Sequence, residues 1–186
     1  MTCKAFTSAR ERFEEIHAEA GARADLLLYA RSLGDGQDCR LWITGKAEPG
    51  AGRRIMRALP PGAMVLNFSV PDPLTPRLES RRVDVIHMDG GLLGYSSEDM
   101  DLRFTMRLKY GLTYACHAAT MVHAMMGWIH HEVGPVDPGD IPRVWEAALN
   151  CGFYLPKPTS HLLEVCLPLQ HAEAEGTDGN VISFRR

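Results

Sequence analysis

An apolar run near the middle of the chain places the strongest constraint on the fold. Residues 63–70 read AMVLNFSV, and apolar side chains fall at both odd and even positions of the run. A strand with one solvated face alternates apolar and polar residues, whereas a strand buried on both faces does not. The run is therefore typical of a parallel sheet with helices on both sides, and it predicts an α/β fold.

Shorter apolar runs and helical segments alternate around this strand. We expect strands at 4–7, 26–29, 40–44 and 83–88, and helices at 9–20 with Ser8 as the cap, at 53–59 and at 74–80. Strands separated by helices and tight Gly/Pro loops indicate a doubly wound sheet. Right-handed crossovers would bring the strand ends at Thr44, Ser69 and Asp89 to one edge, where we expect a ligand to bind.

The sequence of the last third of the chain is typical of helices. Helices are predicted at 113–127 and at 141–150, the second with Pro142 in its first turn and Gly152 after its end. Residues 171–186 are polar and contain Gly. We expect one α/β domain over residues 1–170 and a polar C-terminal tail over 171–186.

Composition limits the class of protein. The 186 residues carry a net charge of −3, which argues against a nucleic-acid partner. No apolar run approaches the roughly 18 residues that span a bilayer, so we expect no membrane association and a cytoplasmic location. The five cysteines are spread without a C-x-x-C pair, as in proteins of a reducing compartment, and offer no paired zinc ligands.

Several segments carry a family resemblance. Residues 62–71 (GAMVLNFSVP), 83–91 (VDVIHMDGG), 114–121 (YACHAATM) and 151–153 (CGF) resemble the C-terminal half of the long-chain acyl-ACP reductases. These are NADPH-dependent Rossmann enzymes that take an acyl thioester onto a cysteine and reduce it to an aldehyde. The resemblance spans residues 4–161. It implies that Cys116 is the acyl-accepting cysteine. His117 and Ala119 depart from the family's pattern, which has a Glu at the position of Ala119.

The chain lacks the Gly-rich turn that binds the dinucleotide in that family, because its first predicted strand corresponds to the family's second. The loop from Gly45 to Gly52 has no Lys-Ser/Thr ending, and we interpret it as a turn. We therefore predict a truncated Rossmann-like, mostly parallel sheet with C-terminal helices. Its unpaired edge favours a homodimer. No cofactor and no metal is expected.

Cys116 and His87 are the predicted catalytic residues. A thiol near a helix start has a lowered pKa and is a strong nucleophile. The alternative is that Cys116 is a small residue buried on an Ala-rich helix face. His87 lies near a strand end beside Asp89 and is a candidate base, or else an interior histidine bonded to a backbone carbonyl. His161, near Ser160, is a third possibility.

Six further residues are predicted to bind the substrate, some at the ends of strands and the rest on the helix that carries Cys116. They are Ser69, Asp89, Gly90, Gly91, Thr120 and Met121. The glycine pair would allow a ligand to approach the backbone closely, or would simply let the chain turn. The Met-rich helix suits a pocket for an acyl chain, and equally an ordinary core.

The sequence thus predicts an enzyme that processes acyl thioesters. Cys116 would attack acyl-ACP or acyl-CoA, and the acyl group would pass to water, an amine or another thiol. One alternative is a subunit of an NADPH-dependent reductase whose nucleotide site is completed by a partner chain. Another is a non-catalytic binding or scaffold protein derived from a reductase.

Overall fold

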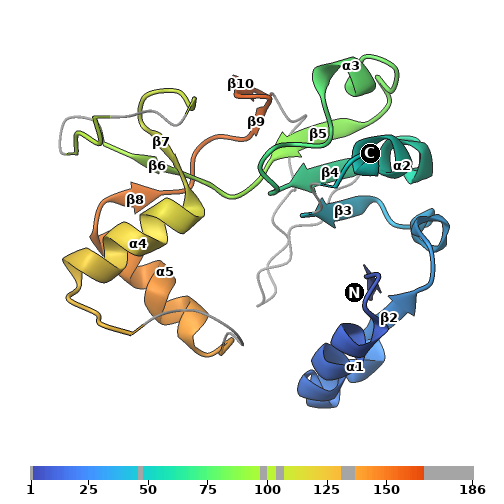
Figure 1. Ribbon diagram of the computed structural model, residues 1–186, viewed down its shortest axis with the longest axis horizontal. Coiled ribbons are helices and arrows are strands. Elements are labelled where there is room, and N and C mark those ends of the chain that lie inside the picture. Colours follow the sequence, from blue (N-terminus) through green and yellow to red (C-terminus); the bar gives the residue numbers. More distant parts are fainter. Residues whose placement is uncertain (1, 46–47, 97–99, 104–106, 131–136, 166–186) are drawn as a thin grey trace, which may run out of the picture.

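The computed structural model describes residues 2–45, 48–96, 100–103, 107–130 and 137–165. The chain forms two lobes, each with its own hydrophobic core (Figure 1). The first lobe contains β1 to β5 with α1 to α3, and the second contains β6 to β8 with α4 and α5. Helices and parallel strands alternate in the first lobe, which confirms the α/β class.

The first lobe follows the predicted order of elements. Its elements are β1 (Cys3–Phe6), α1 (Arg10–Glu19), the 3₁₀ helix Gly21–Leu26, β2 (Leu27–Ala30), the 3₁₀ helix Leu33–Gly36, β3 (Leu41–Thr44), α2 (Ala51–Ala58), β4 (Met64–Asn67), α3 (Pro76–Glu79) and β5 (Ile86–Asp89). Strands β1 and β2 form a parallel pair, and β3, β4 and β5 form a parallel sheet in that order. The N-cap of α1 is Ala9 and not Ser8, with no side-chain cap.

The expected sheet edge exists. Thr44 pairs with Asn67, and Asn67 pairs with Asp89, so the three strands end level with one another. Ser69 lies two residues beyond the end of β4. Polar side chains that follow these strands therefore share one edge of the sheet, as parallel pairing requires.

Helix α2 covers one face of this sheet. Its buried residues Ile55 and Met56 pack with Val65 and Leu74 in the first core. On the other face Ile43 is 65% exposed, so the described part of the chain does not cover that end of the sheet. The expectation of helices on both faces is thus wrong for β3.

The second lobe is an antiparallel sheet backed by two helices. Its elements are β6 (Leu92–Tyr95), β7 (Leu112–Tyr114), α4 (Ala115–Met125), α5 (Asp140–Asn150) and β8 (Phe153–Tyr154), with the strand order β7-β6-β8. The predicted helix at 113–127 begins later than expected, because Thr113 pairs with Leu93 in the ladder. Tertiary pairing overrides the local helical pattern there.

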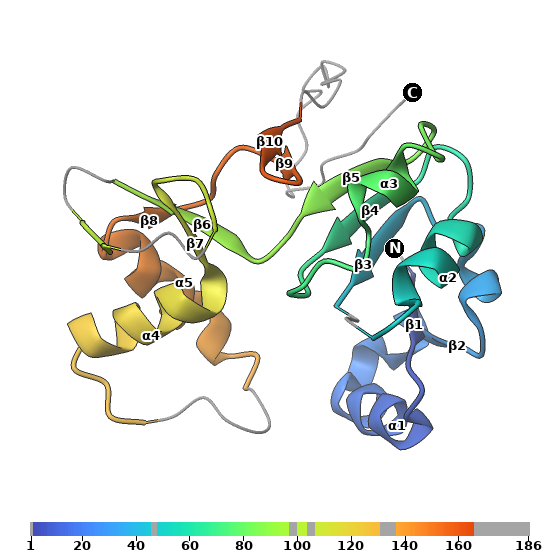
Figure 2. The same ribbon diagram turned by 45° about the horizontal axis from the view of Figure 1, so that its top comes forward.

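A short hairpin returns from the second lobe to the first (Figure 2). It consists of β9 (Thr159–Ser160) and β10 (Leu163–Glu164), joined by the two residues His161 and Leu162. Both have positive φ, at 47° and 66°. Two-residue hairpins favour this geometry, but they normally place Asn or Gly there, because a left-handed conformation costs other residues roughly 1–2 kcal/mol each.

Asp89 secures this strained turn. Its Oδ1 accepts a hydrogen bond from the backbone N–H of His161 at 3.0 Å, and its Oδ2 accepts one from Leu162 N–H at 2.8 Å. The same Oδ2 accepts a third from the Thr159 hydroxyl at 2.7 Å. Hydrogen bonds to a charged acceptor are stronger than neutral ones, so the end of β5 holds the hairpin in place.

None of the helices in the described ranges combines the length and apolar character needed to cross a membrane. The single domain over residues 1–170 stays a prediction, and residues 171–186 lie outside the described residues. Within those ranges, the two cores are built by separate stretches of chain.

Replacing Gly52 by Ala should destabilise the first lobe. A methyl group at this position in α2 would overlap the backbone carbonyl of Pro73, which is rigid. We expect Gly52→Ala to lose about 1–3 kcal/mol of unfolding free energy or more in urea denaturation. Gly34→Ala is the control, since its added methyl meets only the Ser32 hydroxyl at 3.4 Å. Equal stability of the two variants would contradict the close approach of α2 to the Pro73 loop.

Replacing Asp89 by Asn should release the hairpin. The variant loses the charge that three donors share, and we expect a loss of about 2 kcal/mol of unfolding free energy. Amide hydrogen exchange at His161 and Leu162 should accelerate. Asp25→Asn, an exposed carboxylate outside the hairpin, should leave both measurements unchanged. Unaltered exchange in Asp89→Asn would show that the hairpin is held by other contacts.

Candidate functional site

His87 is the buried centre of the candidate site. It occupies the second position of β5 and pairs with Val65 of β4. Its side chain is 1% exposed. A histidine this deeply buried normally has partners for both ring nitrogens, so its surroundings define what the site can do.

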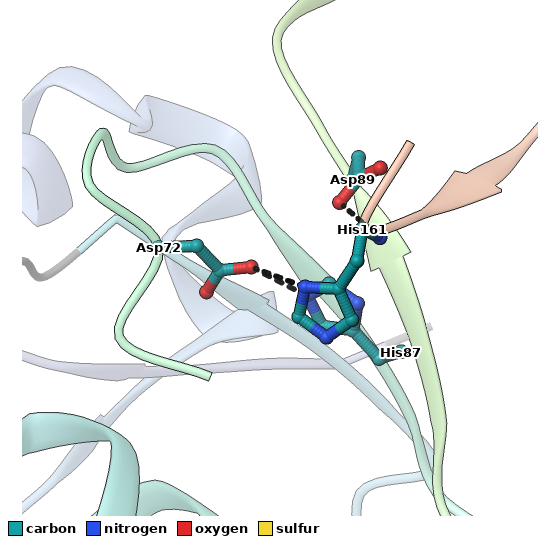
Figure 3. Close-up of side chains that lie close together, drawn as sticks. All are labelled: Asp72, His87, Asp89 and His161. Carbon is teal, nitrogen blue, oxygen red and sulfur yellow. Dashed lines mark hydrogen bonds and ion pairs between the residues drawn. The ribbon is translucent and has the colours of Figure 1, made fainter. Parts of the chain in front are cut away.

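The imidazole of His161 stacks on that of His87. The ring centroids are 4.5 Å apart and the planes are inclined by 13°. The hairpin turn places His161 over β5, next to Asp89 (Figure 3). The strained backbone conformation at His161 therefore places two imidazoles from distant parts of the chain against each other.

Asp72 borders one edge of the stacked rings. Its Oδ2 lies 3.0 Å from His87 Nε2 and 3.8 Å from His161 Nδ1. Its Oδ1 accepts a hydrogen bond from the backbone N–H of Leu74 at 2.7 Å, which orients the carboxylate. The loop that carries Asp72 packs on Gly52 of α2.

Glu79, at the end of α3, borders the opposite edge. Its Oε1 lies 3.1 Å from His87 Nδ1, and its Oε2 lies 2.8 Å from His161 Nε2. The hydroxyl of Ser160 is 2.9 Å from His87 Nδ1 as well. Asp72, Glu79, His87, Asp89 and His161 together are called the histidine–carboxylate cluster below.

The cluster raises the pKa of His87. Burial alone would lower the pKa, but the adjacent Asp72 carboxylate and the negative charges of Glu79 and Asp89 outweigh it. Within the described ranges, the ion pairs of Asp72 and Glu79 are with His87 and His161 alone. The cluster is therefore rich in negative charge and attracts positive charge.

A groove of about 470 Å³ opens beside the cluster. Its polar lining includes Glu79, His87 and Ser160. Most of its remaining lining is apolar and consists of Pro76, Val83, Val85, Ile86 and Val165. The groove is shallow and largely open to solvent.

The structure brings together only part of the predicted site. His87 and Asp89 both belong to the cluster. Ser69 donates its hydroxyl to Asn67 Oδ1 at 2.8 Å. Gly90 donates its N–H to the carbonyl of Asn67, and Gly91 accepts from Ala115 N–H at 2.8 Å. The glycine pair thus connects β5 with the start of α4.

The predicted nucleophile lies in the second lobe. Cys116 is exposed in the first turn of α4, so the alternative of a buried cysteine is wrong. Thr120 donates its hydroxyl to the Cys116 carbonyl at 3.0 Å, and Met121 packs on the second core. No contact joins the Cys116 thiol to His87 within the described residues.

Sequence reasoning missed Asp72 and Glu79. Asp72 lies between two prolines in a loop, and Glu79 ends a helix of four residues. Neither position has a local signal that marks it as functional. Their one common feature is that both lie in the connection between β4 and β5, two neighbouring strands of the parallel sheet.

Comparison with known proteins identifies relatives of the chain. Residues 1–156 match the family described as CER1-like, C-terminal domain. The chain is 33% identical over 156 residues to "Very-long-chain aldehyde decarbonylase GL1-1" of Oryza sativa subsp. indica, covering 79% of this chain and 23% of that protein. It is also 33% identical over 153 residues to "Very-long-chain aldehyde decarbonylase GL1-2" of Oryza sativa subsp. japonica, covering 79% and 22%.

These relatives correct the predicted function. The resemblance to the acyl-ACP reductases is wrong, because the matching family and proteins are of the CER1 type. Acyl-thioester transfer on Cys116 and NADPH-dependent reduction are wrong with it, since the relatives are named as aldehyde decarbonylases. The chain spans less than a quarter of the length of these relatives. The match extends over most of its residues, and the chain belongs to the CER1-like C-terminal domain family.

Proposed function

We propose that this domain binds the carbonyl group of a very-long-chain aldehyde at the histidine–carboxylate cluster. The observation that carries the proposal is the groove, in which polar groups at the cluster, Glu79, His87 and Ser160, adjoin a wall of apolar side chains, with Ser80 and Arg82 also in the lining. The names of the relatives supply the substrate class. An aldehyde with a long alkyl chain has the same division into a polar head and an apolar tail.

The apolar walls supply affinity for the alkyl chain. Val85 and Ile86 line the groove on the β5 side, and Val83 is 93% exposed beside them. Each methylene group that leaves water on binding contributes about 0.8 kcal/mol. Affinity for the alkyl chain should therefore rise with the number of methylene groups in contact with these side chains.

The polar boundary orients and polarises the carbonyl. The Ser160 hydroxyl and His87 Nδ1 lie 2.9 Å apart and both border the groove. If His87 Nδ1–H donates to the Ser160 oxygen, the hydroxyl is left to donate its own proton to a carbonyl oxygen in the groove. A donor fixed before binding stabilises negative charge that develops on that oxygen. The aldehyde carbon becomes more electrophilic as a result.

The proposal concerns the recognition of the aldehyde and not a complete reaction. The chain covers 23% of the length of its GL1-1 relative. The name of that relative describes the activity of the whole, longer protein. The homodimer, the cytoplasmic location and the lack of a cofactor stay predictions from the sequence.

Removal of the His161 imidazole should weaken aldehyde binding. We expect His161→Gly to bind a long-chain aldehyde about 3–10-fold more weakly, because the variant loses the ring that stacks on His87 and positions it beside the groove. Glycine is free of strain at φ 47°, so the backbone of the turn is preserved. The measurement is NMR titration of the His87 ring protons with the aldehyde in detergent micelles.

Two controls make this test specific. Leu162→Gly changes the adjacent left-handed residue in the same way but keeps both imidazoles, and it should bind as the unmodified chain does. The matching alkane should leave the His87 ring protons unshifted, because it has no carbonyl. Equal affinity of His161→Gly and Leu162→Gly for the aldehyde would contradict the proposed site.

A charge in the apolar groove should weaken binding by another route. Val83→Asp places a carboxylate at an exposed position that a stable fold tolerates. We expect the dissociation constant of the aldehyde to rise about tenfold, or 1.4 kcal/mol, with the same shift of the His87 protons at saturation. Ile129→Asp, which is 95% exposed in the second lobe, is the matched control and should have no effect. An unchanged dissociation constant in Val83→Asp would place the alkyl chain elsewhere.

A further inference from the structure

We propose that the histidine–carboxylate cluster binds one divalent transition-metal ion through His87 Nε2, His161 Nδ1 and the carboxylates of Asp72 and Asp89. This inference goes beyond the proposed function, because it requires no aldehyde. It also departs from the sequence analysis, which predicted no metal site.

The four residues have the spacing of a metal centre. One potential ligand atom from each of Asp72, His87, Asp89 and His161 lies within 4.8 Å of all the others. Bonds from zinc to nitrogen or oxygen are about 2.0–2.2 Å long, so ligand atoms on opposite sides of one ion are about 4 Å apart. Contraction of the cluster, together with rotation of the two rings, would bring all four atoms to bonding distance.

His87 presents a buried nitrogen that lacks a hydrogen bond. Its residue is 3% exposed, and Nε2 has no hydrogen-bond partner within the described part of the chain. Asp72 Oδ2 lies 3.0 Å from this nitrogen but not in a direction that makes a hydrogen bond. Buried polar atoms are almost always satisfied, so this nitrogen points to a ligand on the Asp72 side.

Glu79 completes the pattern on the other side of the rings. It lies 3.1 Å from His87 Nδ1 and 2.8 Å from His161 Nε2, the two nitrogens that would not bind the ion. Histidines that ligate metals usually donate the second ring N–H to a carboxylate, which fixes the tautomer and the ring orientation. Here one carboxylate lies close to both of these nitrogens, although His161 Nε2 forms no hydrogen bond within the described residues.

Each of the two carboxylates has an oxygen with capacity to bind the ion. Asp89 Oδ1 accepts one hydrogen bond from the described residues, from His161 N–H, and a carboxylate oxygen has capacity for a second interaction. Asp72 Oδ1 is used by Leu74 N–H, which leaves Oδ2 directed at the two imidazoles. One divalent ion would neutralise both of these carboxylates.

The donor types select the class of metal. Two imidazole nitrogens and two carboxylate oxygens suit zinc and the other late first-row divalent ions, whereas magnesium and calcium prefer oxygen donors alone. Binding also requires the two stacked rings, inclined by 13° in this structure, to turn so that Nε2 of His87 and Nδ1 of His161 converge. Separation of the rings is thus an expected consequence of metal binding.

The test is metal binding by the 186-residue chain after dialysis against a chelator. We expect isothermal titration calorimetry with Zn²⁺ to give one ion per chain, and Co²⁺ to produce the visible absorption bands of a protein-bound ion. His161→Gly should lose both signals. Leu162→Gly, with its matched backbone change, should keep both. Glu79→Gln should keep one ion with an affinity about 10–100-fold lower.

The outcomes separate this inference from the proposed function. Zn²⁺ binding that is equal in His161→Gly and Leu162→Gly, or no binding by the unmodified chain, would overturn the metal site. If aldehyde binding in the NMR titration is still about 3–10-fold weaker in His161→Gly than in Leu162→Gly, the carbonyl site stands without a metal. Metal binding with the expected variant pattern and no aldehyde response would leave the metal site and overturn the proposed function.

Discussion

The carboxylate of Asp89 is the interaction on which the rest of the site depends. It ends β5, so its position is fixed by the parallel ladder with Asn67. From there it binds both N–H groups of the His161-Leu162 turn, whose left-handed residues are unfavourable on their own. The sheet thereby holds a strained turn in place. Strain of this kind persists only where surrounding contacts determine it, and it gathers at functional sites.

The site also depends on the second lobe, although the side chains of the histidine–carboxylate cluster lie beside the first lobe. The chain forms β8, the last strand of the antiparallel sheet, before it returns as the β9–β10 hairpin. The backbone bond from Ala115 to Gly91 joins the lobes directly after β5. The chain therefore passes through the second lobe before His161 reaches His87, and the bonds to Asp89 fix its return to the first lobe.

The strands of the first lobe could be predicted because their signal is local. An apolar run with Gly or Pro at its ends indicates a strand without information from distant residues. The ends of parallel strands then meet at one edge of the sheet. The hairpin had no such signal, since His161 and Leu162 replace the Asn and Gly that usually mark a two-residue turn. Ser160 and His87 are 73 positions apart, and only tertiary structure brings such residues together. The resemblance around Cys116 led to a wrong prediction. A short match in local sequence does not imply a complete acyl-thioester site, which also requires residues from distant parts of the chain.

Charge connects the proposed metal with the proposed aldehyde. Three carboxylates surround two imidazoles, and Asp72 and Glu79 both form ion pairs with those rings. Protons on both rings would place like charges 4.5 Å apart, whereas one divalent ion between Asp72 and Asp89 neutralises the carboxylates and leaves the rings neutral. The groove lies on the Glu79 side of the rings, opposite Asp72. The proposed aldehyde and the proposed ion would therefore use opposite edges of the same His87 ring, and an ion at Nε2 would leave the proton on Nδ1, which faces Ser160.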